Sequence, residues 1–146
     1  MNGDLEAIRR LAQRYARAVD ARDVDALRAL FHPEGTIEGS RGSTTVAEWL
    51  ESMAAPRTFP ISQHFLGDPL VDLDTRTAHA DTYAVVYQVA PDRTLTLGIR
   101  YLDELARRPD GGWAITHRTV LTLWTSEGAG PAAPPSGAPP GSSPPR

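Results

Sequence analysis

The spacing of apolar residues changes once along the chain, from a helical period at its beginning to the alternation of extended strands further on. Asp4 is suited to cap a helix, and after it apolar side chains recur every three or four residues, as one buried helical face requires. This face consists of Leu5, Ile8, Leu11, Ala12, Tyr15, Ala16 and Val19. The pattern predicts a long amphipathic helix that starts near Asp4.

Two shorter helices are predicted next. The first covers Val24–Phe31 and ends where Pro33 follows closely, because proline cannot continue a helix. The second begins at Thr45, which has Glu48 three residues later in the spacing of a capping box. It should end before Pro56. Only a short extended piece, Thr36–Ile37, is expected between these two helices.

Beyond residue 60 the chain is rich in β-branched and aromatic residues between turn-forming residues, which is typical of strands. The predicted strands are Gln63–Leu66, Leu70–Leu73, Thr77–Val89, Leu95–Glu104 and Trp113–Trp124. Turn residues at 72–74 and 108–112 favour antiparallel hairpins. Helices followed by strands indicate an α+β fold, with three helices packed on one face of a curved, mostly antiparallel sheet and a cavity between the two layers.

The length of 146 residues suits one domain, which we expect to span residues 1–124. From Thr125 onward there is no Val, Ile, Leu, Met or aromatic residue, and proline, glycine, alanine and serine dominate. Such a segment cannot bury a core, so residues 125–146 are predicted to be a disordered tail.

Charge and composition exclude several classes of function. A net charge of −3 provides no basic surface for nucleic acid, and the absence of cysteine excludes disulfides, thiolate metal sites and a cysteine nucleophile. No apolar run is long enough for a membrane span, and residues 1–10 do not resemble a signal peptide. We therefore expect a cytoplasmic protein that binds neither nucleic acid nor membrane.

Asp20 and His64 are the candidate catalytic residues. Asp20 lies at the rim of the first helix's apolar face, where its carboxylate either reaches a cavity or caps the following turn. His64 lies in a strand among apolar neighbours, where it is either a buried core residue or a proton shuttle, since its ordinary pKa of about 6.5 suits acid–base work at neutral pH. If the two meet in a cavity, the carboxylate would orient the ring and stabilise its charged form.

Further polar groups are candidates for substrate binding. Tyr15, Tyr87 and Tyr101 are either core residues or phenols that polarise a substrate oxygen. Simple alternation in the last strand places Arg118 and Trp124 on one face, so Arg118 is either a surface charge or a cation in the cavity beside Trp124. The four histidines are too dispersed to predict a metal site, and no phosphate-binding glycine motif or nucleophile elbow is present, which leaves cofactor-free chemistry or pure binding.

Several segments of residues 4–124 resemble a known family: Ile8–Tyr15, Val19–Leu27, Leu30–Gly35, Ser62–Phe65, Gly112–Arg118 and the final Trp124. In residue type and spacing they are similar to the SnoaL-like branch of the NTF2-like superfamily. The resemblance implies a cone-shaped α+β fold in which three helices and a strongly bent sheet enclose one apolar pocket. Because one fold hosts many reactions, it does not specify the reaction by itself.

Within this superfamily the chain most resembles scytalone dehydratase and the bile-acid 7α-dehydratase, and this resemblance implies site residues. An Asp at the end of the first helix and a His on the strand after the third helix form the acid–base centre there, and Asp20 and His64 occupy those positions. Tyr15 and Arg118 match a tyrosine and an arginine of the bile-acid enzyme. Val19 departs from scytalone dehydratase, which has a tyrosine at that position.

The expected function is that of a cofactor-independent dehydratase for a small, largely apolar cyclic or polyketide-like substrate. An isomerase or polyketide cyclase that uses the same pocket is one alternative, and a non-catalytic binding or assembly module is another. We expect no cofactor and no metal. A homodimer or homotrimer is the expected assembly.

Overall fold

The computed structural model describes residues 2–132, which form three helices and seven strands. The helices are α1 (Asn2–Ala21), α2 (Val24–Leu30) and α3 (Val46–Ser52), as the apolar spacing predicts. Thr45 caps α3 in a complete capping box: its side chain accepts a hydrogen bond from the Glu48 amide, and the Glu48 carboxylate accepts one from the Thr45 amide. None of the three helices combines the length and the hydropathy that a bilayer span needs.

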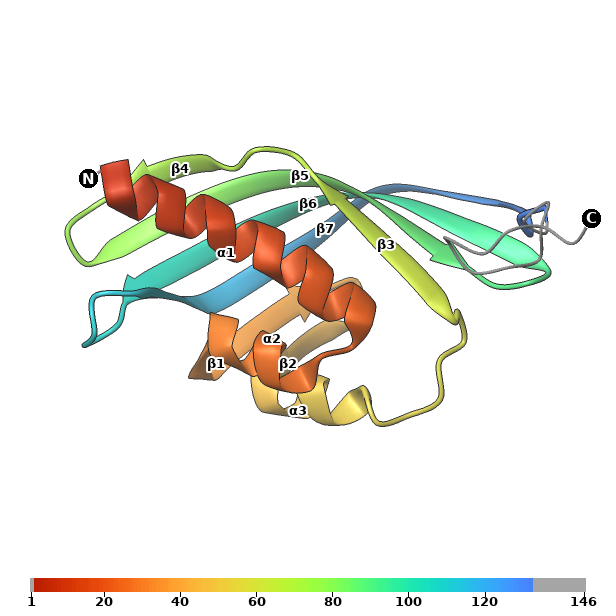
Figure 1. Cartoon of the computed structure of the whole chain (residues 1–146), viewed down its shortest axis with the longest axis horizontal. Helices are drawn as coiled ribbons and strands as arrows, with labels where there is room; N and C mark the ends of the chain where they lie inside the picture. Colours follow the sequence, from red (N-terminus) through yellow and green to blue (C-terminus); the bar gives the residue numbers. More distant parts are fainter. Residues whose placement is uncertain (1, 133–146) are drawn as a thin grey trace, which may run out of the picture.

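The seven strands form one mixed sheet (Figure 1). They are β1 (Phe31–Gly39), β2 (Gly42–Thr45), β3 (Ile61–Leu66), β4 (Leu70–Leu73), β5 (Thr77–Val89), β6 (Arg93–Arg107) and β7 (Trp113–Ala129). The order across the sheet is β2-β1-β7-β6-β5-β3, with β4 also paired to β5. β1 and β7 run parallel, whereas all other neighbours are antiparallel.

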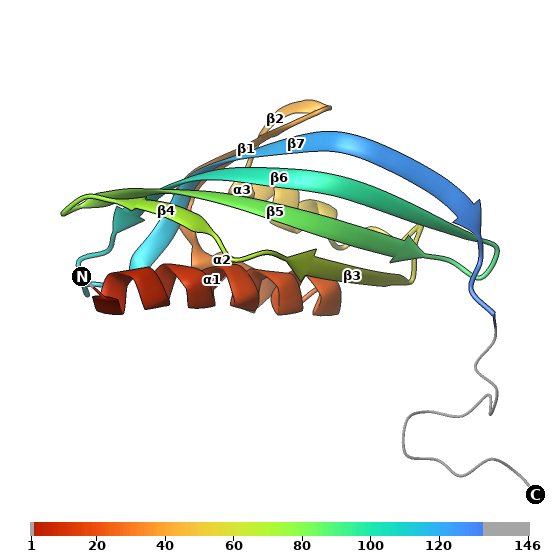
Figure 2. The same cartoon turned by 90° about the horizontal axis from the view of Figure 1, so that it is seen from above.

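The sheet is strongly curved, and the helices lie on its concave side (Figure 2). The apolar face of α1 packs against the inner faces of the long strands, and Ile8, Leu27, Phe31 and Ile115 are almost completely buried there. Each such side chain contributes roughly 1.5–3 kcal/mol to folding. The predicted α+β architecture, helices on one face of a curved and mostly antiparallel sheet, is confirmed.

The largest difference from the sequence prediction concerns residues 31–45. Phe31 begins β1 instead of ending the second helix, and β1 and β2 form a hairpin where only Thr36–Ile37 was expected to be extended. β1 contains Pro33 and Gly35, which are poor strand formers, and it is held by parallel pairing with β7. Tertiary pairing here overrides local preference.

The prediction that the domain ends at residue 124 is corrected at the C-terminal end of β7. This strand continues to Ala129, and Thr125 and Glu127 pair with Leu97 and Leu95 of β6. The pairing uses backbone hydrogen bonds, which do not require the apolar side chains that this segment lacks. The rest of the predicted tail, residues 133–146, lies outside the described residues.

Two irregularities interrupt the β6–β7 pairing. The register shifts between Glu104 and Leu105, and again between Gly98 and Ile99. Each shift inserts an extra residue into β7 and thereby exchanges which of the following side chains face the helices. Simple alternation along β7 therefore fails at two places.

The end of α1 has an unusual cap. The Arg22 amide donates to the Val19 carbonyl and the Asp23 amide donates to the Ala18 carbonyl, which is the hydrogen-bond pattern of a Schellman motif. In this motif the left-handed position normally belongs to glycine, but here Arg22 occupies it with φ +51°. The arginine therefore carries a conformational cost that glycine would avoid.

We predict that Arg22→Gly raises the free energy of unfolding by up to about 1 kcal/mol, because relief of the left-handed strain exceeds the added entropy of the unfolded chain. Urea unfolding followed by circular dichroism measures this change. Arg22→Ala is the matched control, since alanine retains the Cβ atom and should give no such gain. Equal stability of the two variants would contradict the strain.

Candidate active site

Asp20 and His64, which are 44 residues apart in the sequence, are in direct contact. The His64 Nδ1 atom lies 2.6 Å from one carboxylate oxygen of Asp20, and the His64 backbone amide donates to the other at 2.9 Å. The Ser62 hydroxyl donates to the first oxygen at 3.0 Å. The carboxylate of Asp20 thus joins the end of α1 to β3.

Local structure explains why these groups converge. Asp20 lies in the last turn of α1, within the Schellman motif that ends the helix. In β3 the side chains alternate, so that Ser62 and His64 point toward the helices while Gln63 and Phe65 are exposed. Antiparallel pairing with β5 places His64 opposite the buried Val86, which holds the imidazole on the inner face.

The environment of His64 favours the neutral imidazole. Burial is the largest influence and lowers the pKa of His64 below its ordinary value, while the hydrogen bond and charge of Asp20 act in the opposite direction. The positive charge of Arg118 lowers this pKa further. In the neutral ring, Nδ1 carries the proton donated to Asp20, so the lone pair of Nε2 is available as a base.

Aromatic rings and a buried ion pair surround the imidazole. Tyr15 meets His64 and Tyr101 edge to face, with ring centroids 5.9 Å and 5.6 Å away. The Arg118 guanidinium lies 4.1 Å and 4.3 Å from the ring centroids of Tyr15 and Tyr101, and it donates two hydrogen bonds to Asp103, at 2.7 Å and 2.8 Å. Tyr15, Tyr101 and Arg118 were predicted from the sequence as site residues, whereas Asp103 was not.

Arg118 is 2% exposed and Asp103 is 6% exposed, so this ion pair is enclosed by the fold. Although burial opposes the charge, the charge and hydrogen bonds of Asp103 raise the pKa of Arg118 above its ordinary value. Burial also raises the pKa of the Tyr101 phenol well above its ordinary value. Arg118 is therefore a permanent cation, and Tyr101 is a permanent proton donor. The Nη1 atom of Arg118 is buried and has no hydrogen-bond partner among the described residues.

A cavity of about 520 Å³ opens beside His64, which is large enough for a small organic molecule. Tyr15, Ser62 and His64 line it, and Tyr101 and Arg118 lie behind Tyr15. Its apolar lining comes from Val19, Trp49, Met53, Phe59 and Leu95.

Three arginines also line this cavity: Arg22, Arg41 and Arg57. They were not predicted from the sequence, because arginine is common on surfaces and the three lie in separate turns and loops. Arg22 follows α1, Arg41 lies between β1 and β2, and Arg57 lies between α3 and β3. No sequence signal indicated that they share one cavity.

The structure separates Tyr87 and Trp124 from the other candidate substrate-binding residues. Tyr87 lies opposite Gln63 on the outer face of the sheet and is 40% exposed. Trp124 pairs with Gly98, covers it on the outer face and is 49% exposed. The register shift after Thr122 is the reason that Trp124 does not share a face with Arg118, so the expectation from simple alternation that both residues lie on one face was wrong.

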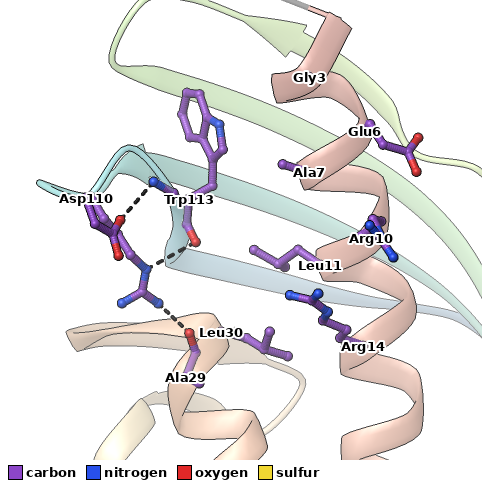
Figure 3. A pocket seen from close by; sticks show the side chains of 12 residues that line it. Gly3, Glu6, Ala7, Arg10, Leu11, Arg14, Ala29, Leu30, Asp110 and Trp113 are labelled. Atoms are coloured by element: carbon purple, nitrogen blue, oxygen red, sulfur yellow. Dashed lines mark hydrogen bonds between the residues drawn. The ribbon is translucent and has the colours of Figure 1, made fainter.

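A second hollow, of about 410 Å³, lies between the first half of α1 and the turn that joins β6 to β7 (Figure 3). Arg10 and Arg14 of α1 line it together with Trp113. The guanidinium of Arg108 there donates to the carbonyls of Ala29 and Trp113. Since no histidine among the described residues lines this hollow, it offers no group that both takes and returns a proton near neutral pH.

Within residues 2–132, no group of three His, Asp or Glu side chains is arranged to hold a metal ion.

Comparison with known proteins agrees with this fold. The sequence profile of the SnoaL-like domain matches residues 3–119, and the chain therefore belongs to the SnoaL-like family. A search of curated proteins gave no match.

Solved structures share the fold at low sequence identity. An NTF2-like superfamily protein from Salmonella enterica is 22% identical with a TM-score of 0.74, over 83% of this chain and 92% of the other. A candidate scytalone dehydratase from Novosphingobium aromaticivorans is 19% identical with a TM-score of 0.73, over 88% and 93%. A hexachlorocyclohexane dehydrochlorinase (LinA) of type 2 is 16% identical with a TM-score of 0.75, over 93% of each chain. At these identities the likeness shows the fold alone.

The environment of His64 leads to a prediction for its titration. The NMR midpoint of His64 should lie below about 6.5, and protonation below that pH should favour the unfolded chain. The contribution of His64 to stability is therefore complete above pH 6.5 and is lost as the pH falls from there toward the folded-state pKa.

Asp20→Asn should move the His64 midpoint further down, because the Asp20 charge and hydrogen bond hold the pKa up against burial. Asp25→Asn is the control, since Asp25 is exposed on α2 and pairs with Arg28. A midpoint that rises or stays unchanged in Asp20→Asn would show that the two groups are uncoupled.

Proposed function

We propose that this protein is a cofactor-independent acid–base enzyme, a dehydratase that eliminates water from a small, largely apolar cyclic molecule. The observation that carries the proposal is the hydrogen bond between Asp20 and the largely buried His64 at the wall of a cavity of suitable size. A histidine held neutral and oriented by a carboxylate can take and return a proton near neutral pH.

In the proposed reaction, Nε2 of His64 takes a proton from the carbon next to an activating carbonyl. The electron pair of that C–H bond forms the new double bond, and the hydroxyl group on the neighbouring carbon departs. The imidazolium returns its proton to this hydroxyl, so that water leaves and the enzyme is restored. Asp20 stabilises the imidazolium between the two steps.

Tyr15 and Arg118 are the groups proposed to polarise the substrate oxygen. Tyr15 lines the cavity next to the imidazole, and the guanidinium of Arg118 lies against its ring. Arg118 is enclosed by the fold and does not line the cavity, so its fixed positive charge would act on the substrate oxygen from behind the ring of Tyr15. Tyr101 is proposed to hold Tyr15 and Arg118 in place.

Two of the structural relatives bear names that denote elimination reactions. One is named as a candidate scytalone dehydratase and another as a hexachlorocyclohexane dehydrochlorinase. These names support elimination over isomerisation or cyclisation, both of which would begin with the same proton removal. A non-catalytic binding module is the remaining alternative.

The test is incubation of the protein in D₂O with a panel of cyclic β-hydroxyketones and β-hydroxy acids, followed by mass spectrometry. A dehydratase yields a product lighter by one water, whereas an isomerase or cyclase incorporates deuterium without that loss. His64→Gln should lower the rate by about 10²–10⁴-fold, the usual contribution of positioned acid–base catalysis. His79→Gln, at an exposed histidine of β5, is the control. Full turnover by a folded His64→Gln protein would overturn the proposal.

The outer face of the sheet supports the expected homodimer or homotrimer. Phe65, Tyr83 and Trp124 are exposed together there, around a shallow groove. Burying such an apolar patch against a second copy would stabilise association. We predict a dimer or trimer by size exclusion with light scattering, and a shift toward monomer in Phe65→Asp. A monomeric wild-type protein would contradict this prediction.

A further inference from the structure

The charges of the cavity beside His64 all have one sign. Among residues 2–132, Arg22, Arg41 and Arg57 line it, and no Asp or Glu does. The nearby carboxylate of Asp20 accepts hydrogen bonds from Ser62 and His64, so it is already engaged. The chain as a whole has a net charge of −3, so this concentration of positive charge is local.

Two of these arginines have donors that the protein leaves unused. The Nε atoms of Arg22 and Arg57 are both buried, and neither has a hydrogen-bond partner among the described residues. One nitrogen of Arg57 donates to the Asp20 carbonyl at 3.3 Å, which places this guanidinium at the end of α1, where Arg22 also lies. Buried donors without acceptors are costly. Because both arginine side chains also line the cavity, a ligand bound there can supply an acceptor once a guanidinium turns toward it.

The backbone of Arg22 supports the same interpretation. It occupies the left-handed position of the Schellman motif, where glycine would complete the same backbone hydrogen bonds without strain. Capping of α1 therefore does not explain an arginine at this position. Backbone strain of this kind is typical of functional positions, and the strained residue here is an arginine that lines the cavity.

We propose that the substrate is an organic acid whose carboxylate is bound by Arg22 and Arg57, while its apolar ring system extends along Trp49 and Phe59 toward His64. A carboxylate can accept paired hydrogen bonds from a guanidinium, which a neutral oxygen cannot match in strength. Arg41, exposed in the β1–β2 turn, adds attraction at the entrance. This inference rests on the proposed function, since it assigns the substrate class of the same cavity.

The probe is 2-naphthoate, and 2-naphthamide is its neutral counterpart of nearly the same shape. Isothermal titration calorimetry should show that the full-length protein binds 2-naphthoate at least about tenfold more tightly than 2-naphthamide, as expected for a charge-assisted hydrogen bond. The Nε–H signals of Arg22 and Arg57 in NMR spectra should shift on addition of 2-naphthoate. Equal binding of the two compounds, or binding of neither at millimolar concentration, would overturn the proposal.

Variants test whether the two arginines are responsible. Arg22→Ala and Arg57→Gln should each weaken 2-naphthoate binding by about tenfold and leave 2-naphthamide binding unchanged. Arg28→Gln removes an exposed arginine of α2 that pairs with Asp25, and it should bind like the wild type. Arg14→Gln tests the second hollow, and loss of binding in that variant alone would place the anion there and overturn the proposal.

Arg22→Gly separates ligand binding from folding. It should unfold at a higher temperature than the wild type while binding 2-naphthoate as weakly as Arg22→Ala. Weak binding by a more stable protein excludes damage to the fold as the cause. If Arg22→Gly binds 2-naphthoate like the wild type, the guanidinium is not a ligand and the inference fails.

The proposed function and this inference fail by different results. A His64→Gln protein should still discriminate 2-naphthoate from 2-naphthamide, because the imidazole is not part of the carboxylate site. Full turnover by that variant would remove the acid–base mechanism and leave the arginine site intact. Loss of discrimination in Arg22→Ala and Arg57→Gln is measured without any reaction, so it supports the site independently.

Discussion

The carboxylate of Asp20 connects the helical layer to the sheet at the point where the proposed chemistry takes place. It accepts hydrogen bonds from the His64 ring, the His64 backbone amide and the Ser62 hydroxyl, and thereby ties the last turn of α1 to β3. Hydrogen bonds to a charged group contribute roughly 1.5–3 kcal/mol each. Because His64 depends on the same contacts for its orientation, the placement of α1 and the direction in which Nε2 points both depend on one side chain.

Besides the carboxylate of Asp20, the interior contains the buried ion pair of Arg118 and Asp103. The Arg118–Asp103 pair lies among the rings of Tyr15, Tyr101 and Phe31, where a cation without its partner would be very costly. The pair lies between neighbouring strands, because β6 and β7 place its two residues directly opposite each other. It supplies a fixed positive charge close to His64 and lowers the affinity of the imidazole for protons. The interior thus contains two polar contacts, Asp20–His64 and Arg118–Asp103, within an apolar core.

Much of the fold follows from short-range patterns. The apolar period of residues 5–19 and the capping box at Thr45 predict α1 and α3, because these signals depend on nearby residues alone. Asp20 and His64 could be selected by residue type and family resemblance, although their contact depends on how α1 meets β3. The β1–β2 hairpin escapes prediction, because pairing with a strand about 80 residues away stabilises it. The cavity arginines escape for a similar reason, since three unrelated turns bring them together.

The extra residue in β7 near Leu123 has a consequence for how such a protein can diversify. Upstream of it, Arg118 faces inward to the ion pair, and downstream of it Trp124 faces outward over Gly98. Deleting the codon for this extra residue would reverse the orientation of the side chains that follow it. The indole of Trp124 would then turn from the outer face of the sheet to the inner face. Insertions and deletions, more than substitutions, can therefore redistribute side chains between the interior and the exterior of this strand while the ladder of backbone hydrogen bonds persists.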